Sequence, residues 1–499
     1  MTLRALGPRA HLATALLFLA GAVIAGRLWV PAFWALGVAF LAVVALAAAR
    51  WPLGTLVGGA LATLADPVLV PRLAPVGLGT GPIGLSEPIL AIAGLVIAVD
   101  AVRRGRWRAA VRDPVVPLAT LFVLLAVISA VVNAVPPLVA LLGIVMTVDA
   151  IAMYVVVRGS PLDERRIGLA VVVVVAATTV VAIVGIGQVL IHPNLLGLAA
   201  YGGHFGEGAR ITAFLGNPNP VAMVLSLGIG FALFGGVALP GARERWAARA
   251  VLLVLVLALL FTFSRSGWIA VGAGVLVIGV VVARRALLLF AVTVVLAVGL
   301  FNVTPRGLAL EPAEPDASPV PPDLVDTTAD RFGNLGTAGD TRRKFTVEGI
   351  PILLDHPWLG VGPGRYGGAA ATILPSPVYA EYGTSLYGYR TIHSFWQHLL
   401  GEAGALGAAA FLAMLAGLLI RFTRAALSTT GGRRVITAGA ASVVVVTGLH
   451  SLTEMIYEGN LPALLIWLLL GLASLLAPVR PVFAREAAAR EVEAVPLSE

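Results

Sequence analysis

Residues 166–190 read RIGLAVVVVVAATTVVAIVGIGQVL, and Arg166 at the start is the one charged residue among them. A run of this kind is long enough for a helix that crosses the hydrocarbon core of a bilayer, which takes roughly 17–25 residues. In lipid such a run must be helical, because every backbone polar group needs a partner within the segment. Similar runs recur along the whole chain, so the sequence predicts an all-α, polytopic transmembrane helical bundle.

The composition agrees with a membrane protein. Of the 499 residues, 59% are hydrophobic and only 12% are charged, whereas about a quarter of the residues in a soluble domain are charged. The net charge of +8 comes mostly from arginines in short segments between the apolar runs, as expected of topology signals rather than of a nucleic-acid-binding face. The chain has no cysteine, which excludes disulfides, thiolate metal sites and cysteine nucleophiles.

The apolar runs define the spans. We place them at residues 11–28, 31–49, 52–70, 84–101, 116–134, 138–157, 166–190, 216–238, 248–263, 266–283, 285–302, 395–420, 433–452 and 459–477. The region 31–70 can be divided differently, and Asp66-Pro67 could make the run at 52–70 broken or re-entrant. The expected number of spans is therefore about 12 to 14.

The basic segments predict the orientation, because cytoplasmic loops carry an excess of Lys and Arg. With these spans, five basic segments and both termini fall on one side, which we take as cytoplasmic: 103–108, 165–166, 243–249, 284–285 and 421–434. The opposite side receives 191–215, 264–266, a large extracytoplasmic loop at 303–393, and 453–458. This arrangement places the chain in the cell inner or plasma membrane as a multi-pass protein.

Five regions follow from the spans. They are an N-terminal transmembrane bundle (1–190), transmembrane helices with outer-face arginine motifs (191–302), the partly helical extracytoplasmic loop (303–393), C-terminal transmembrane helices (394–478) and a cytoplasmic tail (479–499). Within the loop, 304–330 is predicted to be a flexible lead-in, because it is rich in Pro, Asp and Ala.

Two arginine motifs fall on the predicted outer side. Arg210 precedes Gly216-Asn217-Pro218-Asn219, where Asn217 can cap a helix whose N-terminal N–H groups could bind an anion. Arg265 lies between two spans with almost no loop. A charged side chain there costs free energy unless it reaches the headgroups or faces a water-filled cavity. In such a cavity it would suit phosphate. A plain capped helix and an arginine at the headgroups are the alternative interpretations.

A third motif lies in the large loop. The pattern becomes helical from Thr341 to Leu354, with Arg342 and Arg343 in the first turn, and tight turns follow over 355–364. The arginines could hold a substrate or simply form a solvated charged face.

The fourth motif begins where the loop returns to the membrane. His393 lies at the outer mouth of the next span, and Glu402 lies about 13 Å deeper along it. Histidine is the side chain best suited to take up a proton near neutral pH, although a lone histidine can also be a satisfied interfacial residue. His450 and Glu454 are weaker candidates on the same side.

In this order the four motifs resemble the O-antigen ligase and O-antigen polymerase superfamily of bacterial membrane glycosyltransferases. The resemblance covers about residues 200 to 475 and rests on Arg210 with 216–219, on 264–267, on Arg342-Arg343 with 356–364, and on His393 followed by 402–407. In one departure, Ser394 follows His393 where many relatives have asparagine, which leaves His398 as an alternative base.

The resemblance implies a metal-independent, inverting transfer without a cofactor. A glycan would move from undecaprenyl diphosphate onto an extracytoplasmic acceptor, which could be a glycan, a lipid or a protein. The expected roles are His393 as the catalytic base and Arg210 and Arg265 as diphosphate ligands. Further substrate contacts are expected from Arg342, Arg343, Asn217, Asn219 and Glu402. Ligase and polymerase activity remain equally open, because both share these motifs.

Two other classes compete with this interpretation. A transporter or flippase for a lipid-linked or hydrophobic solute would predict charged residues at mid-membrane and internal repeats. The sequence has few of the first and no convincing example of the second. A scaffolding subunit would have no reason to gather arginine and histidine on one side. No nucleic acid partner is expected.

Overall fold

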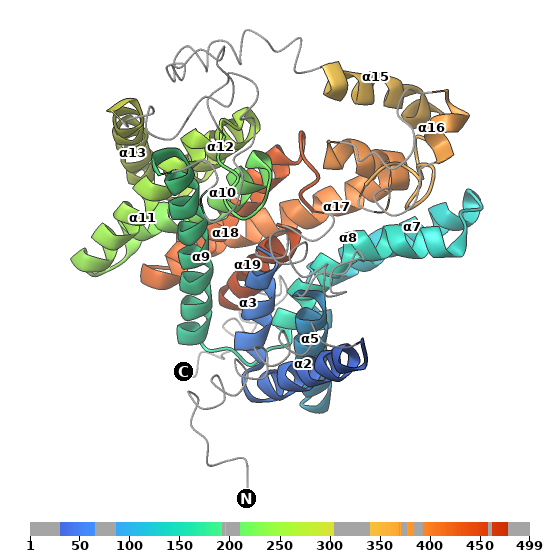
Figure 1. The fold of residues 1–499 in the computed structure, drawn as a ribbon, viewed down its shortest axis with the longest axis horizontal. Helices are drawn as coiled ribbons and strands as arrows, with labels where there is room; N and C mark the ends of the chain where they lie inside the picture. The colour runs from blue at the N-terminus through green and yellow to red at the C-terminus, as the bar shows by residue number, and fades with distance from the viewer. Residues whose placement is uncertain are drawn as a thin grey trace, which may run out of the picture.

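The computed structural model describes residues 30–64, 86–191, 195, 210–303, 340–368, 370, 377–383, 393–457 and 462–477, with the backbone alone for 30–39, 87, 302–303, 340–345 and 377. Every regular element in these residues is a helix, which confirms the all-α class (Figure 1). The helices are α2 (Val30–Arg50), α3 (Pro52–Ala62), α5 (Ser86–Arg103), α6 (Trp107–Val111), α7 (Val115–Val132), α8 (Pro137–Arg158), α9 (Glu164–Leu190), α10 (Pro218–Ala238), α11 (Ala242–Phe261), α12 (Arg265–Val282), α13 (Arg284–Val303), α15 (Asp340–Asp355), α16 (Pro377–Glu381), α17 (Phe395–Ser428), α18 (Gly431–His450) and α19 (Ala463–Leu476).

The chain is a multi-pass membrane protein. Eight of the described helices are long and apolar enough to cross a membrane, namely α7, α8, α9, α10, α12, α13, α17 and α18. Each predicted span that falls on described residues coincides with a helix. The first predicted span (11–28), the end of the run at 52–70, the lead-in at 304–330 and the tail at 479–499 lie outside the described residues.

The core forms around α10 and α19, which are buried along nearly their whole lengths. Small residues allow close approach here. A Cβ atom added to Gly230 of α10 would lie 3.0 Å from the Cβ atom of Ser442, and one added to Gly439 of α18 would lie 2.4 Å from the ring of Phe231. Lipid tails are as apolar as the helices, so tight packing of this kind is what holds membrane helices together.

The outer helices turn large apolar side chains outward. Val131 of α7 is 75% exposed, Val295 of α13 is 71% exposed and Leu95 of α5 is 65% exposed. A surface of this kind would drive association in water, whereas lipid acyl chains cover it at no cost.

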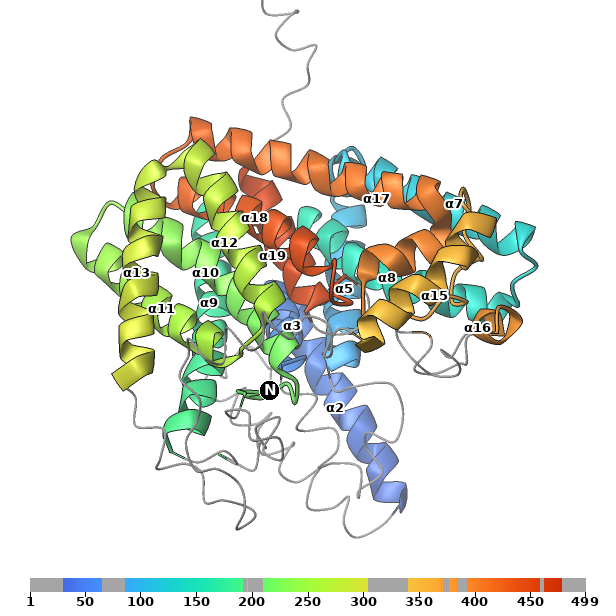
Figure 2. The ribbon, with the colours of Figure 1, turned by 90° about the horizontal axis from the view of Figure 1, so that it is seen from above.

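One predicted span is not a continuous helix. The span expected at 395–420 is α17, which extends to Ser428 and is interrupted at Gly404, where φ is 63° and ψ is −170°. Figure 2 shows α17 running along one edge of the bundle, with α15 beside its first part. Glycine adopts this left-handed region without the Cβ penalty of other residues, so Gly404 can divide the element into two helical segments.

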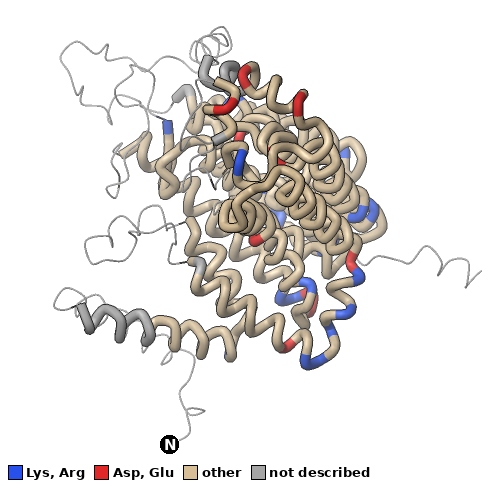
Figure 3. Tube along the Cα trace, turned by 90° about the vertical axis from the view of Figure 1, so that its right-hand side faces the viewer, with Lys and Arg blue, Asp and Glu red and all other residues tan. Residues whose placement is uncertain are grey.

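Contacts between distant connections define one end of the bundle. Arg106 Nε donates to the carbonyl oxygen of Gly159 over 3.1 Å, and Arg433 Nε lies 2.7 Å from Glu164 Oε2. These contacts join the connections α5–α7, α8–α9 and α17–α18, which we call the basic end. In Figure 3 several Lys and Arg residues gather toward the lower right, while the middle of the helices carries few charges. The grouping agrees with the predicted orientation, although which side faces the cytoplasm stays a prediction.

A buried ionic cluster fastens the basic end. Asp113 is 2% exposed, and its Oδ2 atom lies 2.9 Å from Arg158 Nε and 2.7 Å from Arg421 Nη1. Its Oδ1 atom accepts a hydrogen bond from the hydroxyl of Tyr154 over 2.9 Å. Arg421 also donates to the carbonyl oxygen of Ser474 over 2.7 Å. One carboxylate thereby joins the start of α7, α8, α17 and α19.

We expect Asp113→Asn to destabilise the protein by about 3–5 kcal/mol, because two buried guanidinium groups would lose their shared counter-charge. The measurement is thermal unfolding of the purified protein in detergent. Glu164→Gln is the matched control, since that carboxylate pairs with Arg433 at the same end but both side chains are about half exposed. The control should lose no more than about 1 kcal/mol. Equal losses would contradict a structural role for the cluster.

Candidate functional site

Arg210 is held against the end of α11. Its Nε donates to the carbonyl oxygen of Thr262 over 2.8 Å, and its Nη2 donates to the carbonyl oxygen of Phe263 over 3.5 Å. The last carbonyl groups of a helix have no partner within the helix and carry partial negative charge. A guanidinium group both donates hydrogen bonds to these carbonyl groups and balances their partial negative charge. The backbone of Ile211 adds a bond to the carbonyl oxygen of Phe261 at 3.2 Å.

Asn217 and Asn219 form the start of α10. The side chain of Asn217 accepts a hydrogen bond from the backbone N–H of Asn219 at 3.0 Å, which confirms the predicted cap. Asn219 also connects two charged groups. Its Oδ1 accepts from Arg210 Nη2 over 3.2 Å, and its Nδ2 donates to Glu454 Oε1 over 2.7 Å. Asn219 is therefore a bridge between a cation and a carboxylate.

Arg265 is the first residue of α12. Ser264 caps this helix by accepting from the N–H of Gly267 at 3.4 Å, so α11 and α12 are joined with almost no loop, as the sequence predicts. Arg265 is half-buried and lies two positions after Phe263 in the sequence. The carbonyl group of Phe263 accepts the hydrogen bond from Arg210. Phe263 has a φ of 48°, an uncommon conformation for a bulky residue and one that gathers at functional sites.

His393 stands at the start of α17 and is half-buried. Ser394 caps the helix by accepting from the N–H of Gln397 at 3.3 Å. The next residue, Phe395, donates its backbone N–H to the carbonyl oxygens of Ser451 at 3.0 Å and Glu454 at 3.4 Å. The start of α17 therefore lies against the turn that follows α18.

Glu454 is consequently the junction of three motifs. Its side chain contacts Asn219, which contacts Arg210, and its backbone contacts the residue two positions after His393. Contacts among described residues thus bring together the Arg210 motif, the turn with Arg265 and the start of α17. The sequence placed Glu454 on this side but only as a weaker candidate, since no spacing linked it to the others.

Glu402 and His398 lie in a buried cluster below His393. The Oε1 atom of Glu402 accepts from the backbone N–H of Tyr366 at 3.2 Å, and His398 Nε2 lies 3.7 Å from Glu402 Oε2. His398 Nδ1 lies 3.0 Å from the carbonyl oxygen of Tyr366, which can only accept, so Nδ1 carries the hydrogen. His398 is 1% exposed and Glu402 is 4% exposed. Both side chains therefore hold the loop residue Tyr366 and neither lies at the surface.

The glycine-rich loop at 357–362 repairs the interruption in α17. The N–H groups of Val361 and Gly362 donate to the carbonyl oxygens of Gly401 and Glu402 at 2.7 and 3.1 Å. The N–H groups of Ala405 and Leu406 donate to the carbonyl oxygens of Pro357 and Trp358 at 2.8 and 3.2 Å. The loop thus supplies partners for backbone groups that the broken helix cannot pair itself.

Ser129 of α7 and Asn133, the residue that follows this helix, clamp the same loop. Ser129 Oγ donates to the carbonyl oxygen of Leu359 at 2.6 Å, and Asn133 Nδ2 donates to the carbonyl oxygen of Gly360 at 3.0 Å. Neither residue could be singled out from the sequence, because a serine and an asparagine at the end of an apolar run carry no distinctive signal.

The third motif lies beside α17. The predicted helix is α15, and Thr346 Oγ1 donates to Gln397 Oε1 at 3.4 Å, while Gln397 Nε2 donates to the hydroxyl of Tyr366 at 3.2 Å. Burial raises the pKa of Tyr366 to about 12, so the hydroxyl stays protonated. Arg342 and Arg343 belong to the first turn of α15, but their side chains are outside the described residues and their roles stay predictions.

In the described part of the chain, no group of three or more His, Cys, Asp or Glu side chains could hold a metal ion.

Comparison with known proteins identifies part of this architecture. A family model described as O-antigen ligase matches residues 250–412. These residues are therefore similar to the O-antigen ligase family, and we refer to them as the O-antigen ligase domain. The segment contains Arg265, Arg342, Arg343, His393 and Glu402, so the resemblance seen in the motifs is confirmed over this part of the chain. Arg210, Asn217 and Asn219 precede the O-antigen ligase domain, and Glu454 follows it.

The other comparisons add little. No curated protein matches the chain. One solved structure, which concerns structural coordination of polymerization and crosslinking by a peptidoglycan synthase complex, contains a similar chain. The two chains are 18% identical over 74% of this chain and 97% of that one, with a TM-score of 0.35.

We expect Gly360→Ala to detach the loop at 357–362 from α17. The residue has a φ of +67°, and an added Cβ atom would lie 2.4 Å from the carbonyl oxygen of Gly401. Gly383→Ala is the matched control, because its φ is +60° but nothing lies within 4 Å of an added Cβ atom. The left-handed conformation alone costs roughly 1–2 kcal/mol in both variants. Thermal unfolding and protease cleavage between 340 and 370 should change far more in Gly360→Ala, and equal changes would contradict the docking role.

Proposed function

We propose that this protein is a membrane glycosyltransferase that moves or polymerises a glycan from undecaprenyl diphosphate onto an extracytoplasmic acceptor. The observation that supports the proposal best is the chain of contacts Arg210–Asn219–Glu454–Phe395, which joins two arginine motifs to the start of α17, next to His393. The O-antigen ligase domain supports the same class, since it contains Arg265 and His393.

The arginines would bind the diphosphate of the donor. A diphosphate leaving group gains negative charge as the glycosidic bond breaks, and preorganised cations stabilise that charge without a metal ion. Arg210 is suited to this task because the carbonyl groups of Thr262 and Phe263 fix its guanidinium group before a substrate binds. Arg265 directly follows the turn at 262–264 that binds Arg210. Both cations would therefore act on one diphosphate.

His393 would act as the general base. It would remove the proton from the acceptor hydroxyl as the hydroxyl oxygen attacks the anomeric carbon from the face opposite the diphosphate, which inverts the configuration. Its half-buried position leaves the ring within reach of a substrate, whereas His398 is 1% exposed and bonded to Tyr366. These facts favour His393 over His398 as the base.

The remaining parts of the proposal concern substrate contacts and orientation. Arg342 and Arg343 at the start of α15 would hold the donor or the acceptor, while Asn217, Asn219 and Glu402 would shape and support the site. The site would face away from the cytoplasm, because it is formed by connections other than those of the basic end. The acceptor would be a glycan, a lipid or a protein.

We expect Arg210→Ala and Arg265→Ala each to lower transfer by about 10²–10³-fold, the usual loss for one donor to a developing anion. His393→Ala should lower it by about 10²–10⁴-fold. The assay follows glycan transfer by purified protein from a polyprenyl-diphosphate-linked donor, with folding checked by thermal melt. Arg424→Ala is the control, since Arg424 is exposed at the basic end, and it should retain wild-type transfer.

The outcomes separate the competing classes. If the folded Arg265→Ala and His393→Ala proteins retain near-native transfer, the assigned site is wrong. If the wild-type protein transfers no glycan from any lipid-linked donor tested, but moves such donors across a vesicle membrane, the protein is a transporter.

Removal of metal ions should leave transfer unchanged. In the proposed reaction the arginines alone stabilise the leaving diphosphate, so incubation with EDTA followed by assay in chelator should give the untreated rate. Loss of activity in EDTA that Mg²⁺ or Mn²⁺ restores would show that the charge stabilisation assigned to Arg210 and Arg265 is incomplete.

A further inference from the structure

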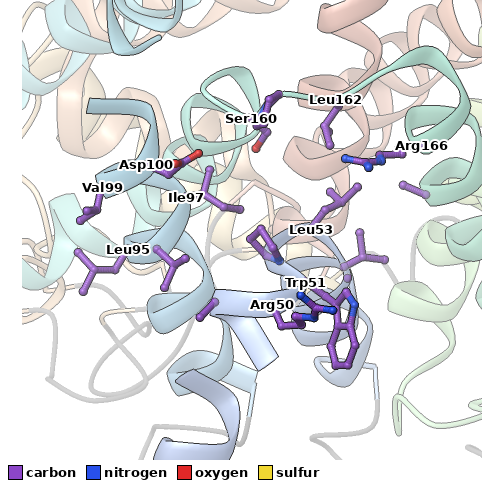
Figure 4. A pocket seen from close by; sticks show the side chains of 18 of the residues that line it. Arg50, Trp51, Leu53, Leu95, Ile97, Val99, Asp100, Ser160, Leu162 and Arg166 are labelled. Atoms are coloured by element: carbon purple, nitrogen blue, oxygen red, sulfur yellow. The ribbon is translucent and has the colours of Figure 1, made fainter. Parts of the chain in front are cut away.

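A separate cavity lies at the basic end, away from the candidate site. It has a volume of about 1160 Å³ and is lined by residues of α2, α3, α5 and α9 and of the α8–α9 connection. Figure 4 shows Arg50 and Trp51 on one side of Leu53, and Arg166, Asp100 and Ser160 on the other. No residue of the candidate site lines it.

The rim of this cavity carries excess positive charge. Arg50 and Arg103 line it and are exposed, and in the part of the chain that the structure describes neither guanidinium group has a hydrogen bond or an ion pair. The carboxylate that lines the cavity, Asp100, is already paired with Arg104 at 2.7 Å and with Arg106. Arg50 and Arg103 therefore have no counter-charge among the described residues, and the rim would suit an anionic ligand.

Most of the remaining lining is apolar, although Arg104, Ser160 and Arg166 also contribute to it. Leu53, Leu61 and Val173 contribute to it, as do Leu95 and Leu169, which are 65% and 63% exposed. The cavity thus combines a cationic rim with an apolar wall between helices of a membrane protein. An amphiphile with an anionic headgroup matches both parts, and basic pockets between membrane helices are known to bind such headgroups.

We propose that this cavity binds an anionic phospholipid. The anionic headgroup would lie at the rim, attracted by the charges of Arg50 and Arg103, and the acyl chains would lie along Leu53, Leu95 and Leu169. This proposal is independent of the proposed glycan transfer, because it concerns different residues at the opposite end of the bundle.

Other segments of the chain match the cavity less well in charge. Residues 1–29 contain Arg4, Arg9 and Arg27 and no acidic residue, and residues 65–85 contain one aspartate and one arginine. Neither segment brings net negative charge. The tail at 479–499 contains four glutamates and three arginines, so its removal forms part of the test.

The test uses the full-length purified protein and native mass spectrometry with an equimolar mixture of phosphatidylglycerol and phosphatidylcholine. The wild-type protein should retain phosphatidylglycerol preferentially. Arg50→Gln/Arg103→Gln should weaken phosphatidylglycerol binding about 30-fold, since each arginine near an anionic headgroup contributes roughly fivefold. Arg112→Gln/Arg424→Gln is the control, because it removes the same charge from exposed positions at the same end that do not line the cavity.

A second pair of variants tests the cavity by shape alone. Gly58 lines the cavity, and nothing lies within 4 Å of an added Cβ atom, so Gly58→Phe should fill the space without disturbing α3. Phosphatidylglycerol binding should fall at least tenfold. Gly272→Phe on α12 also enters open space but lies away from the cavity, and it should bind as the wild type does.

Three results would overturn the proposal. The first is an equal loss in both arginine pairs, which would indicate general surface charge. The second is unchanged binding in Gly58→Phe, which would place the lipid elsewhere. The third is a tenfold gain in phosphatidylglycerol binding when residues 479–499 are removed, which would make the tail the natural occupant.

Discussion

The structure depends on one constraint, which is that a backbone polar group in lipid must find its partner within the protein. Continuous helices meet this constraint by themselves. The interruption of α17 at Gly404 does not, and the loop at 357–362 supplies both the acceptors and the donors that the break leaves open. The large loop after α13 is therefore more than a connection, because its docked segment completes a helix. Glycines at the contact, such as Gly360, allow the backbones to approach within hydrogen-bonding distance.

The same constraint explains where the polar side chains gather. Helix ends leave carbonyl and N–H groups unpaired, and the ends of α11 and α18 and the starts of α10, α12 and α17 meet at one end of the bundle. Arg210 satisfies carbonyl groups of the α11 end, while Asn217 and Ser264 satisfy N–H groups of helix starts. In the proposed site, these contacts hold the charged groups in position before any substrate arrives. This preorganisation is the property that electrostatic catalysis requires.

Composition and apolar runs were sufficient to predict the helical fold, because a long uncharged run has one solution in lipid. The cap at Asn217 was also predicted, since a cap depends on neighbouring residues only. The cap at Ser264 depends on the same kind of signal but was not predicted. The break at Gly404 was not predictable, because one glycine within an apolar run does not reveal the loop that pairs with it. Glu454 was underestimated for the same reason. Its importance comes from Asn219, which lies 235 positions away in the sequence.

The positions of the two histidines of α17 separate structure from proposed chemistry. His398 lies with Glu402 and Tyr366 in a closed, buried cluster, in which His398 and Glu402 of α17 each bond to the backbone of the loop residue Tyr366. A base must exchange protons with a substrate, and a ring that is 1% exposed and bonded to a carbonyl group cannot do so without undocking the loop. His393 precedes the cap of the same helix and is half-buried. The cluster around His398 fixes the start of α17, which His393 precedes. The buried pair His398 and Glu402 therefore supports the orientation of His393, the proposed base.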